Sequence, residues 1–126
     1  MNNIKDETIE LITSEVFNES FWLFELGRAE IITANKTDID NQFMNSFYDN
    51  GQRLWQESKD KIVEALCDRN KNEPREMIQE LTSGNIKDIV VNIISLLTTT
   101  YSFTLAIAIP LCALILKKGI NNICKA

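Results

Sequence analysis

Residues 89–116 read IVVNIISLLTTTYSFTLAIAIPLCALIL and contain no acidic or basic side chain. An apolar run of about 18 residues or more is the usual mark of a transmembrane helix, and this run is 28 residues long. Six of the seven residues 98–104, at the centre of the run, carry a hydroxyl group, which lipid exposure does not favour. The run therefore decides whether the chain is a membrane protein or a helical protein that buries this segment.

Two membrane arrangements fit the run. In the first, residues 96–116 make a single pass that kinks at Pro110 and places Lys117 and Lys118 at the membrane interface. In the second, several copies assemble, and the hydroxyl face lines a pore or packs helix against helix. A single pass with the N-terminal part inside would export the tail KKGINNICKA, and the positive-inside rule disfavours the export of its three lysines.

A third arrangement is a helical hairpin over residues 86–99 and 103–123 that turns at the hydroxyl cluster. Each arm is then too short to span a bilayer and is expected in a protein core. The second arm begins FTLAIAIPLCALIL and is apolar on every side. It therefore needs neighbours all round, either from the same chain or from an oligomer.

The candidate residues for membrane insertion or self-association run the length of this segment, through the hydroxyl groups at its centre to the lysines at its end. They are Ile89, Ile93, Leu97, Thr99, Ser102, Leu105, Ile109, Leu116, Lys117 and Lys118.

The distribution of charge divides the chain into an acidic helical domain, residues 1–85, and an apolar C-terminal segment, residues 86–126. Residues 1–88 hold all 18 acidic groups and ten of the 13 basic groups, whereas residues 89–126 hold only three lysines. An acidic surface repels a phosphate backbone, so we expect no binding to nucleic acid.

Hydrophobic residues recur at helical spacing in the N-terminal part, and no two-residue alternation indicates a strand. We therefore predict an all-α fold: a small helical bundle of about 4-5 helices, followed by a strongly apolar C-terminal helix or helical hairpin. Gly27 marks a close approach between helices or is a tolerated helical glycine. The sequence DNG at 49–51 is a strong turn signal and indicates two helices there, at about 38–49 and 52–68.

The sequence FWLF at 21–24 places four large hydrophobic side chains in succession. They cannot all face one side of a helix, so either this helix is central to the packing or part of it meets a partner. Phe21, Trp22 and Phe24 are the candidate partner contacts, because aromatic residues are frequent at the centres of interfaces.

The chain contains no histidine, which removes the commonest general base and the commonest transition-metal ligand. Its four glycines are isolated and form no phosphate-binding loop. Cys67, Cys112 and Cys124 form no CxxC pair and no zinc spacing, and their odd number predicts reduced thiols rather than a disulfide framework. Cys112 lies in the apolar run and is expected to act as a small hydrophobic residue. We predict no catalytic residue, no cofactor and no metal, and therefore a chain that is not an enzyme.

The leading hypothesis is a small non-enzymatic protein that binds a protein partner or senses an input through its N-terminal domain. It would then act by membrane insertion or homo-oligomerisation of its apolar segment. The N-terminus MNNIKDETIE has no signal-peptide pattern, so the N-terminal domain is expected in the cytoplasm, either anchored to the inner membrane or free. Small helical proteins of bacterial antiviral defence and conflict systems look broadly similar, although no motif carries that comparison.

The alternative hypothesis is a soluble all-α accessory subunit of a larger complex, with the apolar segment as core or interface. A related alternative is an immunity-type binder whose acidic half masks a basic partner.

Overall fold

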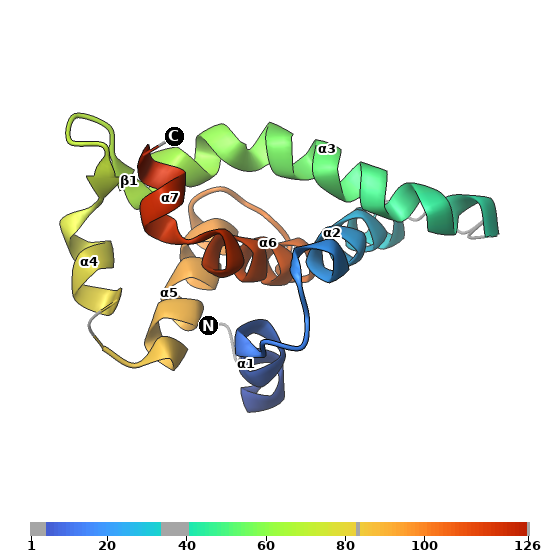
Figure 1. The fold of residues 1–126 in the computed structure, drawn as a ribbon, viewed down its shortest axis with the longest axis horizontal. Helices are drawn as coiled ribbons and strands as arrows, with labels where there is room; N and C mark the ends of the chain where they lie inside the picture. The colour runs from blue at the N-terminus through green and yellow to red at the C-terminus, as the bar shows by residue number, and fades with distance from the viewer. Residues whose placement is uncertain (1–4, 34–40, 83, 126) are drawn as a thin grey trace.

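The computed structural model describes residues 5–33, 41–82 and 84–125 (Figure 1). Over these residues the chain forms seven helices and one pair of very short strands, in the order α1 (Asp6–Thr13), α2 (Glu19–Thr33), α3 (Asn41–Leu66), β1 (Cys67–Asp68), β2 (Glu73–Pro74), α4 (Glu76–Thr82), α5 (Ile86–Thr99), α6 (Leu105–Lys118) and α7 (Ile120–Lys125). The helical fold class is therefore confirmed.

The strand pair is the exception to the all-helical prediction. Strands β1 and β2 pair antiparallel, with Cys67 opposite Pro74 and Asp68 opposite Glu73. Each strand has only two residues, which is too short for a two-residue alternation to show in the sequence.

The apolar run forms two helices, α5 and α6, rather than one. The bounds of α5 are those of the first arm of the hairpin arrangement, and the break falls within the hydroxyl cluster, but the expected second arm, residues 103–123, is divided at Gly119 into α6 and α7. Ser102 interrupts the helical conformation there, because its φ of +60° lies in the left-handed region. In the ranges that the structure describes, no helix combines the length and the apolar character needed to cross a membrane.

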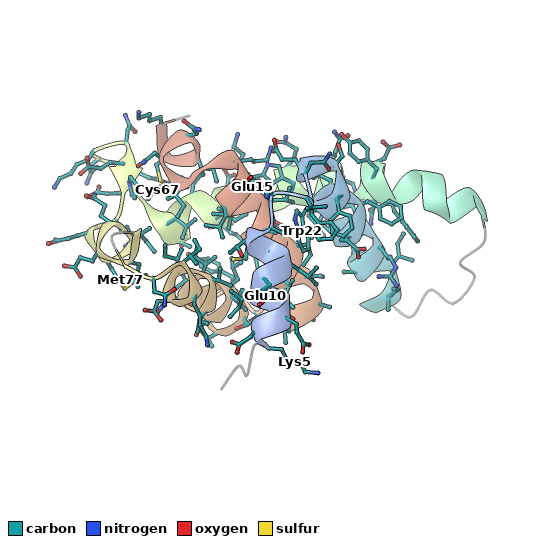
Figure 2. All side chains as sticks on the ribbon, turned by 60° about the horizontal axis from the view of Figure 1, so that its bottom comes forward. Lys5, Glu10, Glu15, Trp22, Cys67 and Met77 are labelled. Carbon is teal, nitrogen blue, oxygen red and sulfur yellow. A yellow bond between two sulfur atoms is a disulfide. The ribbon has the colours of Figure 1, made fainter. Side chains whose placement is uncertain are left out.

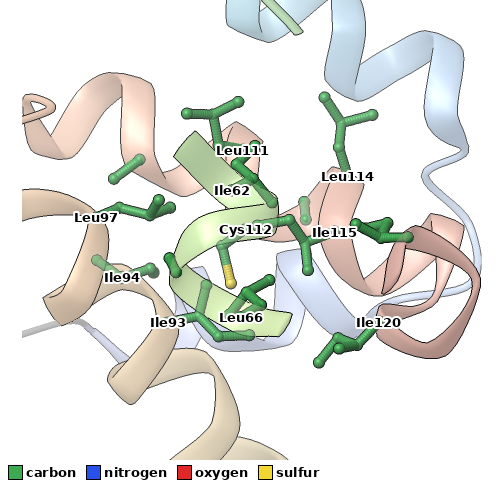
Figure 3. Close-up of a cluster of buried hydrophobic side chains, with 14 of the residues drawn as sticks. Ile62, Leu66, Ile93, Ile94, Leu97, Leu111, Cys112, Leu114, Ile115 and Ile120 are labelled. Atoms are coloured by element: carbon green, nitrogen blue, oxygen red, sulfur yellow. The ribbon is translucent and has the colours of Figure 1, made fainter. Parts of the chain in front are cut away.

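Helix α6 lies in the middle of the fold and contacts α1, α2, α5 and α7 (Figure 1). A helix that is apolar on every side needs contacts on every side, and these four neighbours provide contacts on several of them. Leu111, Cys112, Leu114 and Ile115 of this helix are fully buried, and they pack with side chains from α3, α5 and α7 (Figure 3). The buried cluster includes residues from both the acidic domain expected at 1–85 and the apolar segment expected at 86–126.

Helices α2 and α3 approach each other closely at Gly27 and Gly51. A Cβ atom on Gly27 would collide with the carbonyl oxygen of Phe47, and one on Gly51 would collide with the carbonyl oxygen of Leu23. Gly27 therefore marks a close helix–helix approach, one of its two predicted roles. The predicted break at 49–51 is wrong, because α3 runs through Gly51 and this glycine makes room for α2.

The prediction of reduced thiols is wrong for two of the three cysteines. Cys67 of β1 and Cys124 of α7 form a disulfide with a Cα–Cα distance of 5.5 Å. The two residues are 57 positions apart and neither lies in a spacing motif, so only the fold brings them together. Cys112 is free and buried in α6, which confirms its role as a small hydrophobic residue.

Candidate functional site

A groove of about 390 Å³ lies between α1, α2 and α6. Most of its lining is apolar, with one ion pair and one hydroxyl residue among the side chains. The lining residues are Thr8, Leu11, Phe21, Trp22, Glu25, Arg28, Ala29, Ile32, Ala106, Ile109 and Pro110.

Each helix presents one ridge to this groove. Helix α2 contributes residues 21, 22, 25, 28, 29 and 32, which follow the helical repeat and share one face. Helix α6 contributes Ala106, Ile109 and Pro110, and α1 contributes Thr8 and Leu11 at a spacing of three. Three ridges from separate parts of the sequence therefore enclose the groove.

The start of α2 is set by Asn18, whose side-chain oxygen accepts a hydrogen bond from the backbone N–H of Phe21 at 2.9 Å. Phe21 then packs edge-on against Trp22, with 5.0 Å between ring centroids, and lies 4.5 Å from the ring of Phe17. The cap and the aromatic contacts together hold the first turn of α2 at the groove.

The groove has exposed apolar edges. Leu11 and Ile32 are 46% and 44% exposed although both line it. Leu105, which precedes the lining residue Ala106, is also exposed. Large hydrophobic side chains that remain exposed around one concavity are typical of a binding surface.

Polar groups with incomplete hydrogen bonding also occur at the groove. The indole N–H of Trp22 is buried and has no hydrogen-bond partner among the described residues. Pro110 lacks an N–H, so it cannot donate the usual helical hydrogen bond to the carbonyl of Ala106. Arg28 is bonded to Glu25 at 3.3 Å, with its side chain half-exposed, so this ion pair contributes little to stability.

The structure brings together members of both predicted sets. Phe21 and Trp22, predicted as partner contacts, line the same groove as Ile109, predicted as a membrane or oligomer residue. Phe24 does not join them, since it packs edge-on against Phe47 of α3 at 5.2 Å.

The remaining apolar candidates lie mainly in the core. Ile89, Ile93 and Leu97 of α5 are buried, and Leu116 of α6 is half-buried against the same cluster. These residues therefore contribute to the packing of the hydrophobic core.

The hydroxyl candidates lie at the surface of the α5–α6 turn. Thr99 is exposed, and its hydroxyl donates to the carbonyl of Ser95 at 2.7 Å. Ser102 is exposed in its left-handed conformation. Nearby, Tyr101 donates its hydroxyl hydrogen to Glu64 of α3 at 3.3 Å, so the turn is attached to that helix.

The two lysines at the end of α6 are engaged within the chain. Lys117 donates to the carbonyl of Ser14 at 2.6 Å. Lys118 pairs with Glu19 at 2.8 Å and lies 5.3 Å from the ring centre of Trp55. Both lysines fasten the C-terminal end of α6 to the first half of the chain.

A larger hollow of about 620 Å³ lies beside the strand pair, but its lining is mostly charged or polar. Arg75, one of its cations, already donates to the carbonyl of Glu64 at 2.8 Å. Within the described ranges, no group of three or more Cys, Asp or Glu side chains is arranged to hold a metal ion. The smaller apolar groove is therefore the stronger candidate site.

The chain matches no family model, no curated protein and no solved structure. The geometry of its surface is therefore the basis for a functional proposal.

Sequence reasoning missed Leu11, Ile32 and the part played by α6 in the groove. The spacing of residues 21, 25, 28 and 32 gave a signal for one face of α2. Nothing in the sequence shows that α6 lies opposite that face, because this contact joins segments far apart in the chain.

Proposed function

We propose that the chain is a non-enzymatic binding protein and that its groove receives the apolar face of an amphipathic helix from a protein partner. The observation that carries this proposal is the exposure of Leu11 and Ile32, which line one mostly apolar groove from two different helices, α1 and α2. Grooves between helices bind partner helices through apolar side chains at i, i+3, i+4 and i+7.

The lining residues suit this mode of binding. Phe21 supplies partly exposed aromatic surface, Trp22 lies buried beside it at the wall of the groove, and aromatic residues are enriched among those that dominate binding energy. Thr8, Glu25 and Arg28 place polar groups beside the apolar lining, where they can orient an occupant. The proposal develops the alternative of an accessory or immunity-type binder.

Insertion of the apolar segment into a membrane has less support from the geometry. It would require α5 and α6 to leave the core, in which Ile93, Leu97 and Leu111 are fully buried. Binding at the groove requires no such rearrangement.

The proposal is tested by photocrosslinking in cells that produce the protein. A photoreactive residue is placed at Leu11 or Ile32, and in matched controls at Met77 or Ile86, which are 54% and 46% exposed and lie outside the groove. We expect one and the same partner to crosslink from both groove positions and from neither control.

A second substitution tests whether the groove itself is responsible. With the photoreactive residue at Ile32, Leu11→Glu should abolish capture, because it places a charge in the apolar lining, whereas Met77→Glu should leave capture unchanged. Equal capture from Met77 and Ile86, or capture that survives Leu11→Glu, would refute a groove-bound partner.

A further inference from the structure

We propose that the helix bound in the groove is basic on its polar face, so that it pairs with free carboxylates beside α1. This inference rests on the proposed function, since it names the charge of the occupant. The carboxylates are those of Glu7, Glu10 and Glu15.

Most other acidic groups near the groove are already neutralised within the chain. Asp6 of α1 pairs with Lys87 at 2.9 Å, and Glu25 of α2 pairs with Arg28 at 3.3 Å. At the two ends of α2, Glu19 and Glu30 also pair with cations, Lys118 at 2.8 Å and Arg53 at 2.7 Å respectively. These four acids therefore offer little uncompensated charge to a partner.

Glu7, Glu10 and Glu15 differ from them. All three are exposed, and none makes an ion pair with any residue that the structure describes. Lys5 is the one cation in residues 5–18 and leaves these three carboxylates with a net charge of −2.

These carboxylates border the part of the chain that forms the α1 wall of the groove. Glu7 is one helical turn from the lining residue Leu11 and lies on the same side of α1, whereas Glu10 lies on the neighbouring, solvent-exposed face of this helix. Glu10 and Glu15 lie on and just after α1, on the same side of the molecule as Trp22 (Figure 2).

Charge complementarity then favours a basic helix over an acidic one. Among the described lining residues the one cation is Arg28, and it is paired with Glu25. An acidic helix would therefore meet three carboxylates beside α1 that outnumber Lys5, the single cation of residues 5–18. A basic helix would gain favourable pairs at the rim and associate faster at low salt.

Three helical peptides with identical leucine faces test this inference. Their polar faces carry lysine, glutamine or glutamate, and they are called the lysine, glutamine and glutamate peptides. We expect the lysine peptide to bind about ten-fold more tightly than the glutamate peptide at low salt, with the glutamine peptide between them. High salt should reduce this difference because it screens exposed charges.

Charge-removing variants of the protein assign the effect to these carboxylates. The triple variant Glu7→Gln, Glu10→Gln and Glu15→Gln should bring the affinities of the three peptides together. The matched control removes three exposed carboxylates around the strand pair and outside the groove lining, through Asp60→Asn, Glu73→Gln and Glu76→Gln, and should retain the preference.

The outcomes separate the two proposals. Equal binding of all three peptides, lost on Leu11→Glu, would overturn the basic occupant and leave the groove function standing. Preferred binding of the glutamate peptide would also overturn it. Failure of every peptide to bind would contradict the groove function itself.

Discussion

At the scale of single residues, Gly27 and Gly51 hold α2 and α3 at a distance that no side chain allows. Neighbouring polar groups use this proximity: the Asn50 side chain donates to the carbonyl of Gly27 at 3.1 Å and to Glu30 at 2.7 Å. Asn50 and Gly51, which look like turn formers in the sequence, are therefore contact residues between two helices.

We predict that Gly27→Ala and Gly51→Ala each lower the free energy of unfolding by about 3 kcal/mol or more, because the added Cβ meets backbone atoms that cannot move aside separately. Gly84→Ala is the matched control, since its Cβ would lie in ordinary contact, 3.5 Å from the nearest carbonyl oxygen. Denaturant unfolding measures all three. Equal effects at the three glycines would contradict the close approach.

Ser102 adopts a backbone conformation that glycine prefers. Ser102→Gly should raise the free energy of unfolding by about 0.5 kcal/mol, because relief of the left-handed conformation exceeds the added entropy of the unfolded chain. Thr100→Gly has the same entropic cost with no strain to relieve, since the φ of Thr100 is −88°, and should destabilise the protein. A Ser102→Gly protein as unstable as the Thr100→Gly protein would count against this geometry.

Cys112 is the one free cysteine of the described chain, and burial raises the pKa of its thiol. A raised pKa means that the reactive thiolate forms only above the usual pH range for cysteine, so alkylation should remain negligible in the native protein at pH 8. Iodoacetamide labelling followed by mass measurement should detect Cys112 only after unfolding. Rapid labelling of the native protein would contradict its buried position.

At the scale of elements, the sequence predicts several boundaries well. The hairpin is one of three arrangements that the uncharged run allows, and its first arm, residues 86–99, has the bounds of α5, whereas its second arm, residues 103–123, is divided between α6 and α7. The polar residue Asn18 precedes the apolar stretch at residues 21–24, and its side chain caps α2, which begins at Glu19. These features depend on local pattern, which a single sequence contains.

Other elements depend on contacts that local pattern does not contain. Helix α3 continues through residues 49–51 because packing against α2 outweighs their turn preference. Val16 lies at helical spacing from Ile9 and Ile12 in the sequence, yet α1 ends at Thr13 and Val16 is 82% exposed. The groove also depends on contacts between distant segments, because it exists only where three separate helices meet.

At the scale of the whole molecule, the disulfide joins the end of α3 to the C-terminal helix. Removing it through Cys67→Ser and Cys124→Ser should lower the free energy of unfolding by about 4 kcal/mol, because the bond closes a loop of 57 residues in the unfolded chain. Cys112→Ala serves as a control that leaves the bond in place. Denaturant unfolding under non-reducing conditions compares them, and an unchanged stability of the double variant would contradict the disulfide.

The central claim is that an amphipathic helix occupies the groove between α1, α2 and α6, and the fluorescence of Trp22 tests it most directly. The chain has two tryptophans, so Trp55→Phe leaves Trp22 as the reporter in the groove, and Trp22→Phe leaves Trp55 beside Lys118. The glutamine peptide, with a brominated phenylalanine on its apolar face as a contact quencher, is titrated into each variant. We predict saturable quenching of Trp22 and none of Trp55; equal quenching of both, or no quenching of Trp22, would contradict binding in the groove.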